Sequence, residues 1–208
     1  TLRIANDYAA VIEGHKAGNI HIGYHGPSAY VRAWTVTNRG VEPFVTTINS
    51  DGSVGYYSVA YAKSSAPGAK LEDYKGKSLC LVDPNSTSGS NMPRYAMNKI
   101  GIEPDKFFAK VVYAGSHENA VTAVAQGTCD VGFNWWNSET DSNLTRMVNK
   151  GMVKKEDFKI VFKSDLLAGS PYIYITSMPS EIRAAIAKAF ADPPKKDKAA
   201  VDKFSDGK

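Results

Sequence analysis

Three consecutive hydroxyl residues lie in the stretch DPNSTSG, residues 83–89, and give it the composition of an anion-binding turn. Ser86, Thr87 and Ser88 can each donate an O–H, and Gly89 permits close approach of a ligand. A helix that begins here would add the free N–H groups of its first turn. A tetrahedral oxyanion fits these donors. The ordinary alternative is a helix N-cap after a proline turn, which needs only one hydroxyl.

The sequence contains none of the common catalytic or cofactor motifs. The turn lacks the GxxxxGK[ST] pattern of a phosphate-binding loop, and no GxSxG elbow or strand-end pair of carboxylates is present. The cysteines and histidines have no spacing typical of a metal site. Asp83, before Pro84, is better placed to tie the turn together than to act as a base. The sequence therefore predicts a binding protein without cofactor or metal.

The elements that must position this turn alternate between strands and helices. Apolar strands are expected at LRIAN, NIHIGYHG, KSLCLVD, KVVYAG and CDVGFNW. Helices are expected at DYAAVIEGHKAG, from Pro27 through SAYVRAW, from about Ser86 to Ile100, at HENAVTAVAQG, and from about Ser138 to Asn149. Continuously apolar strands that alternate with helices favour an α/β fold with mainly parallel sheets flanked by helices.

In parallel α/β sheets, ligands bind where strands end and helices begin. This rule selects four stretches: Asp7-Tyr8, Asp83 to Gly89, Ser116-His117-Glu118, and Asn134 to Asn137. Trp135 and Trp136 are expected to wall the same site, or else to pack at the edge of a lobe. His25 is expected near the site because it follows a strand, whereas His21 is expected to be structural.

A weak internal repeat relates residues 8–25 to residues 117–134 without a gap. Both segments contain a helix that ends in glycine, Gly18 or Gly127, followed by a short apolar strand. The repeat places Tyr8 and His117 at equivalent positions in the first turn of a helix. One interpretation is two similar lobes, whose donors meet in one cleft. The other is that any α/β protein offers such matches, and His117 alone would then be a surface residue.

The two-lobe interpretation assigns 1–54 plus 172–208 to lobe 1 and 58–168 to lobe 2. Two aromatic stretches, 54–65 and 170–178, are the candidate crossings, with hinges near 55–57 and 169–171. Lobe 2 has a strand and helix before HENAV that have no counterpart before Leu2. An N-terminal βα unit of lobe 1 is therefore expected to be missing from this chain.

Composition is that of a globular protein, with 208 residues, 43% hydrophobic, 22% charged, and a net charge of +4. No apolar run approaches the roughly 20 residues of a membrane span, and the first residues lack the pattern of a signal peptide. The lysines do not form the basic cluster that is typical of a nucleic-acid-binding surface. Cys80 and Cys129 are expected to be free, buried strand residues, with a disulfide between them as the less favoured alternative.

Four motifs, NDYAAVIEG, GYYSV, DPNSTSG and AGSHENA, resemble those of the PhnD-type phosphonate-binding proteins of ABC importers. The resemblance covers essentially the whole chain. It implies a two-lobed type II periplasmic binding fold, a periplasmic location, and a membrane permease as partner. It also implies capture of a small phosphorus oxyanion, with no enzymatic activity. The ligand-binding residues that it implies, together with two that the strand-end rule adds, are Tyr8, Tyr56, Ser86, Thr87, Ser88, His117, Glu118 and Asn137.

Departures from the family pattern bear on the ligand. Where binders of aminoethylphosphonate have acidic residues, this chain has Asn137 and Ser170, and the two tryptophans are expected to crowd a long substituent. These differences favour phosphite or methylphosphonate. The alternatives are a protein for sulfonates or another anion, or an enzyme of the same fold, either similar to thiamine-pyrimidine synthases or a phosphoryl hydrolase using His117.

Overall fold

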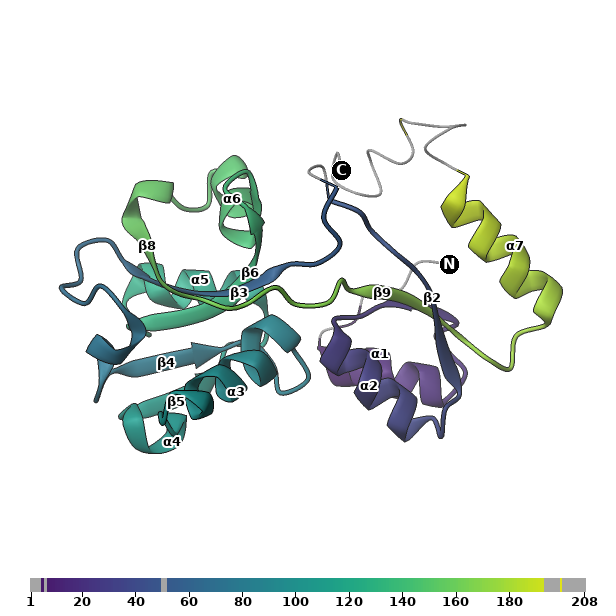
Figure 1. Cartoon of the computed structure of the whole chain (residues 1–208), viewed down its shortest axis with the longest axis horizontal. Coiled ribbons are helices and arrows are strands. Elements are labelled where there is room, and N and C mark those ends of the chain that lie inside the picture. Colours follow the sequence, from purple (N-terminus) through teal and green to yellow (C-terminus); the bar gives the residue numbers. More distant parts are fainter. Residues whose placement is uncertain (1–4, 6, 50–51, 193–198, 200–208) are drawn as a thin grey trace. The chain divides into compact units, whose positions relative to one another are not determined.

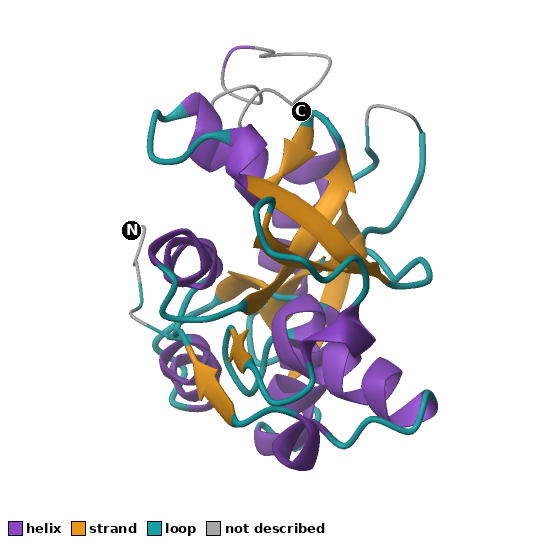
Figure 2. Ribbon diagram, turned by 90° about the vertical axis from the view of Figure 1, so that its left-hand side faces the viewer, coloured by secondary structure: helices purple, strands orange, loops and turns teal. Residues whose placement is uncertain are grey.

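The structure is a computed structural model that describes residues 5, 7–49, 52–192 and 199 (Figure 1). The chain divides into two compact units. Unit 1 comprises Thr1–Gly55 and Ala168–Lys208, and unit 2 comprises Tyr56–Leu167. The strand predicted at LRIAN and the charged C-terminal stretch lie almost entirely outside the described residues. In both units helices flank a sheet, as the α/β prediction requires (Figures 1 and 2).

Unit 1 contains a sheet with strand order β1-β9-β2. Its elements are α1 (Tyr8–Lys16), β1 (Ile22–Tyr24), α2 (Pro27–Val36), β2 (Val41–Thr46), β9 (Pro171–Ile175) and α7 (Ser180–Ala191). Both β1 and β2 pair antiparallel with β9, so the parallel sheet predicted for this lobe is wrong for its described strands. The reason is that β9 arrives from far along the chain and inserts between β1 and β2, which a local hydrophobic pattern does not encode.

The core of unit 1 joins its helices to this sheet. Ile12 of α1 and Ala33 of α2 are buried with Val41, Ile173 and Ile175 from the strands. The N-cap of α1 is Asp7, whose carboxylate accepts a hydrogen bond from Ala10 N at 2.7 Å. The start of α1, and with it Tyr8, is therefore set by a local cap.

Unit 2 contains a five-strand path, β5-β4-β6-β3-β8, with β7 paired to β6. Its strands are β3 (Tyr57–Lys63), β4 (Ser78–Leu81), β5 (Lys110–Tyr113), β6 (Val131–Ser138), β7 (Asp141–Ser142) and β8 (Phe158–Lys163). Its helices and turns are η1 (Leu71–Tyr74), η2 (Thr87–Asn91), α3 (Met92–Lys99), α4 (Pro104–Phe107), α5 (His117–Gln126), α6 (Asn143–Asn149) and η3 (Lys155–Asp157). β4 pairs parallel with β5 and β6, whereas β3 pairs antiparallel with β6 and β8. The sheet is mixed where a mainly parallel one was predicted.

The helix predicted from Ser138 begins later, because β6 continues through Ser138 and turns back into β7. Pairing of β6 with β3, where Tyr57 lies opposite Trp136, keeps this polar stretch extended. Ser142 then caps α6 by accepting a hydrogen bond from Thr145 N at 3.1 Å. The late start matters for the site, since it places Trp135, Trp136 and Asn137 in a strand.

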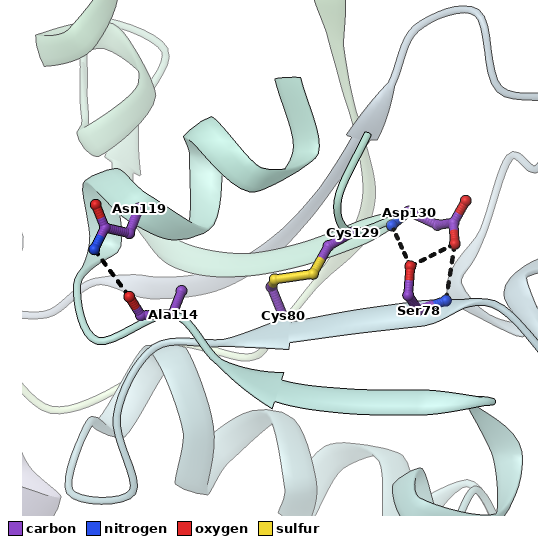
Figure 3. Close-up of a disulfide and its surroundings, with 6 residues drawn as sticks. All are labelled: Ser78, Cys80, Ala114, Asn119, Cys129 and Asp130. Atoms are coloured by element: carbon purple, nitrogen blue, oxygen red, sulfur yellow. Dashed lines mark hydrogen bonds between the residues drawn. A yellow bond between two sulfur atoms is a disulfide. The ribbon is translucent and has the colours of Figure 1, made fainter. Parts of the chain in front are cut away.

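Cys80 and Cys129 form a disulfide, with their Cα atoms 5.8 Å apart (Figure 3). The prediction of free thiols is therefore wrong. The parallel pairing of Leu79 with Val131 brings the residue that precedes β6 by two positions beside β4. In the same place Asp130 accepts hydrogen bonds from Ser78 N at 2.8 Å and Ser78 Oγ at 2.6 Å. Both contacts join residues about fifty positions apart, so only the sheet topology reveals them.

Two buried histidines face each other in unit 1. His15 Nε2 lies 3.0 Å from His25 Nε2, and His15 Nδ1 lies 2.8 Å from the carbonyl of Ile20. Because that carbonyl can only accept, Nδ1 of neutral His15 carries the proton and its Nε2 accepts from His25 Nε2–H. Burial is the main cause that lowers the pKa of His15 and lowers that of His25 to about 4. His25 is thus a structural residue of unit 1, and His21, predicted to be structural, is exposed.

This pair predicts that acid destabilises the fold. Below the unperturbed pKa of 6.5 the unfolded chain takes up a proton at His25, whereas the folded chain does so only near pH 4. The free energy of unfolding should therefore fall as pH drops from 6.5 to 4, by roughly 3 kcal/mol from His25 alone. Urea denaturation at several pH values measures the slope.

The matched variants are His25→Gln, which keeps a side-chain donor but does not titrate, and His21→Gln at an exposed position. His25→Gln should reduce the loss of stability in acid, and His21→Gln should leave it as in the original protein. Equal slopes for the original protein and His25→Gln would show that this pair does not set the acid response.

Candidate functional site

Three parallel strands of unit 2 end at one edge of its sheet. β4 lies between β5 and β6, and the loop after β5 is tied to β4 by hydrogen bonds from Ala114 N to Leu81 O and from Gly115 N to Val82 O, both 2.8 Å. β3 runs the opposite way, so it begins at this edge. The edge therefore gathers η2, the start of α5, the end of β6 and the start of β3. The binding residues that were predicted from separate parts of the sequence lie in or next to these four elements.

The turn before η2 is held by its own side chains. Ser86 is the N-cap, and its Oγ accepts from Gly89 N at 3.1 Å. Asp83 Oδ1 accepts from Asn85 N at 2.7 Å, and Asn91 Nδ2 donates to Pro84 O at 2.9 Å. Asp83 thus ties the turn, as its position before a proline indicates. As an acceptor at the cap, Ser86 still has its own O–H to donate.

The helix predicted from Ser86 opens as a π-helical turn, η2, before α3 continues it. Ser86 and Ser88 are buried almost completely and Thr87 is 8% exposed. Ser88 O accepts from Ser58 Oγ at 2.6 Å, which fastens the turn to β3. A Cβ on Gly89 would lie 2.4 Å from the Val82 side chain, which gives this glycine a packing role beside the predicted one. Its small size serves packing of the turn onto the strand.

His117 is the first residue of α5, at the edge of the sheet where the hydroxyl turn also lies. Ser116 caps the helix by accepting from Asn119 N at 3.1 Å, and Asn119 Nδ2 donates to Ala114 O at 2.9 Å (Figure 3). The ring atom Nδ1 is shielded from solvent and has no hydrogen-bond partner among the described residues. A buried polar atom without a hydrogen bond destabilises the folded state by about 1–3 kcal/mol. Burial is the main cause that lowers the pKa of His117 to about 4, against a smaller opposing effect of a hydrogen bond with the Asn134 side chain, so the ring is neutral at pH 7.

Tyr56 and Asn137 lie where β3 begins and β6 nears its end. Tyr56 is buried and pairs through its backbone with Leu167, at 3.2 and 2.8 Å. Asn137 follows Trp136, which lies opposite Tyr57, so Tyr56 and Asn137 occupy neighbouring strands. Glu118 is in the first turn of α5 but is exposed. Of the predicted residues of unit 2, Glu118 is the one that the structure supports least.

The two tryptophans have different surroundings. Trp136 packs edge-on against Tyr57, and Lys163 Nζ lies 3.8 Å from the centre of the Trp136 ring. Trp135 lies under the guanidinium of Arg146, at 4.8 Å. Adjacent residues of a strand point to opposite faces of the sheet. The prediction that both tryptophans crowd one side of a ligand is therefore wrong.

Tyr8 lies in unit 1, and the structure supports its equivalence to His117 in the local repeat. α1 begins at Tyr8 after the cap Asp7, as α5 begins at His117 after the cap Ser116. Gly18 and Gly127 both have a left-handed φ, 71° and 78°. The strands that follow begin at Ile22 and Val131, again 109 positions apart. The local repeat is confirmed over helix, turn and strand start. Ser170, also in unit 1, accepts from Thr46 Oγ1 through its carbonyl at 3.0 Å.

Sequence reasoning did not identify the hydrogen bonds that support the predicted residues. Ser58 holds the hydroxyl turn, Asn134 donates to the backbone of His117 at 2.8 Å, and Asp141 accepts from Asn137 at 2.6 Å. Ser58 lies in the GYYSV motif and Asn134 in a stretch that the strand-end rule selects, but the sequence does not reveal their supporting roles or that of Asp141, since each acts on a partner distant in the chain or across a hairpin. No cluster of three metal-ligating side chains exists within the part of the chain that the structure describes. Over the same residues, no helix has the length and hydrophobicity needed to cross a bilayer.

Comparisons with known proteins agree with this arrangement. A family model described as ABC transporter, phosphonate, periplasmic substrate-binding protein matches residues 1–207. The chain is 34% identical over 195 residues to the phosphate-import protein PhnD of Mycolicibacterium smegmatis, covering 90% of this chain and 59% of that protein. It is also 34% identical over 177 residues to the phosphonates-binding periplasmic protein of Escherichia coli, covering 82% and 49%.

Among solved structures, a binding protein component of an ABC phosphonate transporter from Pseudomonas aeruginosa has a similar fold, with a TM-score of 0.79 and 28% identity. The match covers 89% of this chain and 61% of that one. The chain thus spans about half to three fifths of the length of the relatives that it matches. The resemblance found in the four motifs is confirmed for the family and for the α/β fold.

Proposed function

Because this chain belongs to the periplasmic substrate-binding proteins of phosphonate ABC transporters, we propose that it captures a small phosphorus oxyanion and delivers it to a membrane permease. The ligands that we favour are phosphite and methylphosphonate. The protein breaks no bond in this role, and its site needs no cofactor.

The observation that carries the proposal is that the hydroxyl turn and the start of α5, with His117, lie at the same edge of the sheet of unit 2. A neutral imidazole with a lowered pKa can donate to a ligand oxygen, as can the O–H groups of Ser86, Thr87 and Ser88. Tyr56 adds a further O–H from the start of β3. Uncharged donors in fixed positions discriminate between anions by geometry. A ligand that leaves a buried donor or acceptor unpaired loses about 1–3 kcal/mol of binding free energy.

The repeat supports a contribution from unit 1. We propose that Tyr8, the counterpart of His117, donates its phenolic O–H to the same ligand, and that hinges near 55–57 and 169–171 let the ligand favour a closed state. A permease that recognises the closed state would then distinguish the loaded protein from the empty one.

The disulfide supports a location outside the cytoplasm. Disulfides persist in oxidising compartments such as the bacterial periplasm and are rare in the cytosol. The Cys80–Cys129 bond is thus consistent with export to the periplasm, independently of the family.

A thermal-denaturation screen tests the proposed ligands. The compounds are phosphite, methylphosphonate, ethylphosphonate, aminoethylphosphonate, phosphate and sulfate; phosphate is included because one relative is named for phosphate import. A ligand at a concentration of 100 times its dissociation constant raises the free energy of unfolding by about 2.7 kcal/mol, which is enough to shift the melting temperature by several degrees.

We expect the largest shift with phosphite or methylphosphonate and a small one with aminoethylphosphonate. An ammonium group that meets Asn137 and Ser170 lacks a charge-assisted contact worth roughly 1.5–3 kcal/mol, or tenfold to a hundredfold in affinity. A shift with the aminated ligand alone would contradict this choice. No shift with any phosphorus compound would contradict the proposed function.

A further inference from the structure

A short polar network holds the side chain of Asn137 at the end of β6. Asn137 Nδ2 donates to Asp141 Oδ2 at 2.6 Å. Asp141 lies in β7, the strand that folds back onto β6, and its other oxygen, Oδ1, is 3.9 Å from Arg146 NH2 of α6. Asn137 is therefore oriented by the hairpin that follows it, and that hairpin is in turn connected to α6.

This network decides which atom of the Asn137 amide is offered to other partners. Asp141 pairs with the Arg146 cation as a carboxylate, and a carboxylate can only accept hydrogen bonds. The nitrogen of the amide must therefore face Asp141. Oδ1 is left as the acceptor of the side chain. Without Asp141 the amide could turn and offer its nitrogen, which is a donor.

The strand register places Asn137 on the same face of the sheet as the hydroxyl turn. Ser58 lies directly opposite Trp135, so the two side chains share a face. Ser58 Oγ donates to Ser88 O, which shows that this face carries η2. Ser142 of β7 lies opposite Trp136 and shares its face, so the neighbouring Asp141 lies on the other face, that of Trp135. The pairing shifts register between Trp136 and Ser138, but the hydrogen bond from Asn137 to Asp141 keeps the Asn137 side chain on this face.

The charges around Asn137 suit an anion nearby. A lone carboxylate behind the amide would repel an oxyanion, but Arg146 compensates the charge of Asp141. The guanidinium also rests on the ring of Trp135 at 4.8 Å, which holds it in place. The group presented on the η2 face is consequently a neutral acceptor, in contrast to the donors of the turn and of His117.

We infer that Asp141 is a positioning residue, which fixes Asn137 as a hydrogen-bond acceptor and so selects an oxyanion that keeps one acidic proton. The P–O–H group of such a ligand donates to Asn137 Oδ1, while its remaining oxygens accept from the hydroxyl turn and His117. An anion of the same shape and charge that has no such proton would place an acceptor oxygen against Asn137 Oδ1, which is also an acceptor. This inference rests on the proposed function and names the protonation state that the site takes.

Methylphosphonate and methanesulfonate form the test pair. At mildly acidic pH both are monoanions of nearly equal shape, and only methylphosphonate has an O–H. Isothermal titration calorimetry on the full chain should show the original protein preferring methylphosphonate by roughly tenfold to a hundredfold. In Asp141→Ala the preference should fall by about tenfold, because the freed amide can turn its nitrogen towards either ligand.

Two further variants complete the design. Glu139→Ala removes an exposed carboxylate from the same hairpin, where it pairs with Lys155 at 2.9 Å, and should leave the preference unchanged. Asp141→Asn keeps the volume and, if Asp141→Ala fails to fold, replaces it; an amide at 141 no longer forces one orientation on Asn137, so the preference should still fall.

The outcomes separate this inference from the proposed function. Equal weakening of both ligands in the Asp141 variants, with an unchanged ratio, would show that Asp141 only supports the fold and would overturn the inference. Methylphosphonate binding without preference over methanesulfonate in the original protein would also overturn it, while the proposed function stands. If no phosphorus oxyanion binds the original protein, both fail.

Discussion

His117→Ala and Thr87→Ala should each weaken methylphosphonate binding by roughly tenfold to a hundredfold while the protein stays folded. A hydrogen bond from a fixed donor to a charged ligand contributes about 1.5–3 kcal/mol, and no water replaces it in a closed site. His117→Ala removes the packing of the ring but also a shielded ring nitrogen for which no hydrogen bond is satisfied, so the two effects on the free energy of unfolding oppose each other and the net change should be small. Titration calorimetry and urea denaturation measure the two quantities.

The matched controls are His21→Ala and Thr128→Ala, both at exposed positions. They should bind as the original protein does. If His117→Ala and Thr87→Ala retain full affinity, DPNSTSG is an ordinary capped turn and the site must be sought elsewhere. A loss of affinity that accompanies unfolding would instead point to a structural role, which the denaturation curves separate.

Replacing both cysteines, Cys80→Ala with Cys129→Ala, should lower the free energy of unfolding by about 4 kcal/mol. The disulfide closes a loop with a sequence separation of 49, and the chain-entropy model gives this value for a loop of that length. The cross-link lies in unit 2, between β4 and the residues that lead into β6, the strands that support the hydroxyl turn and Asn137. The loss should therefore appear in the unfolding of the unit that carries most of the site.

Urea denaturation of the double variant, and of the original protein with and without a reducing agent, measures this effect. The reduced original protein should resemble the double variant. A difference below 1 kcal/mol between oxidised and reduced protein would mean that the cross-link constrains the unfolded chain little. At saturating ligand the double variant should regain stability, since binding acts on the folded state alone.

Local chemistry was predictable from the sequence where neighbours in the chain decide the structure. Ser86 as a cap, Asp83 as the tie of its turn, and the helix starts at Tyr8 and His117 all depend on hydrogen bonds that span a few residues. Three of the four family motifs, NDYAAVIEG, DPNSTSG and AGSHENA, lie in these same segments, which is why the family can be inferred from the sequence.

Long-range pairing decided what the sequence did not reveal. β9 enters the sheet of unit 1 from far along the chain, β4 brings Cys80 to Cys129, and the β6–β7 hairpin joins Asn137 to Asp141. Apolar periodicity reports that a strand is buried, but it does not identify the neighbour or its direction, because the backbone hydrogen bonds of a sheet are nearly independent of side-chain identity. The residues that we propose as oxyanion donors could therefore be identified in the sequence, whereas the hydrogen bond that orients the proposed acceptor, Asn137, was set by tertiary structure.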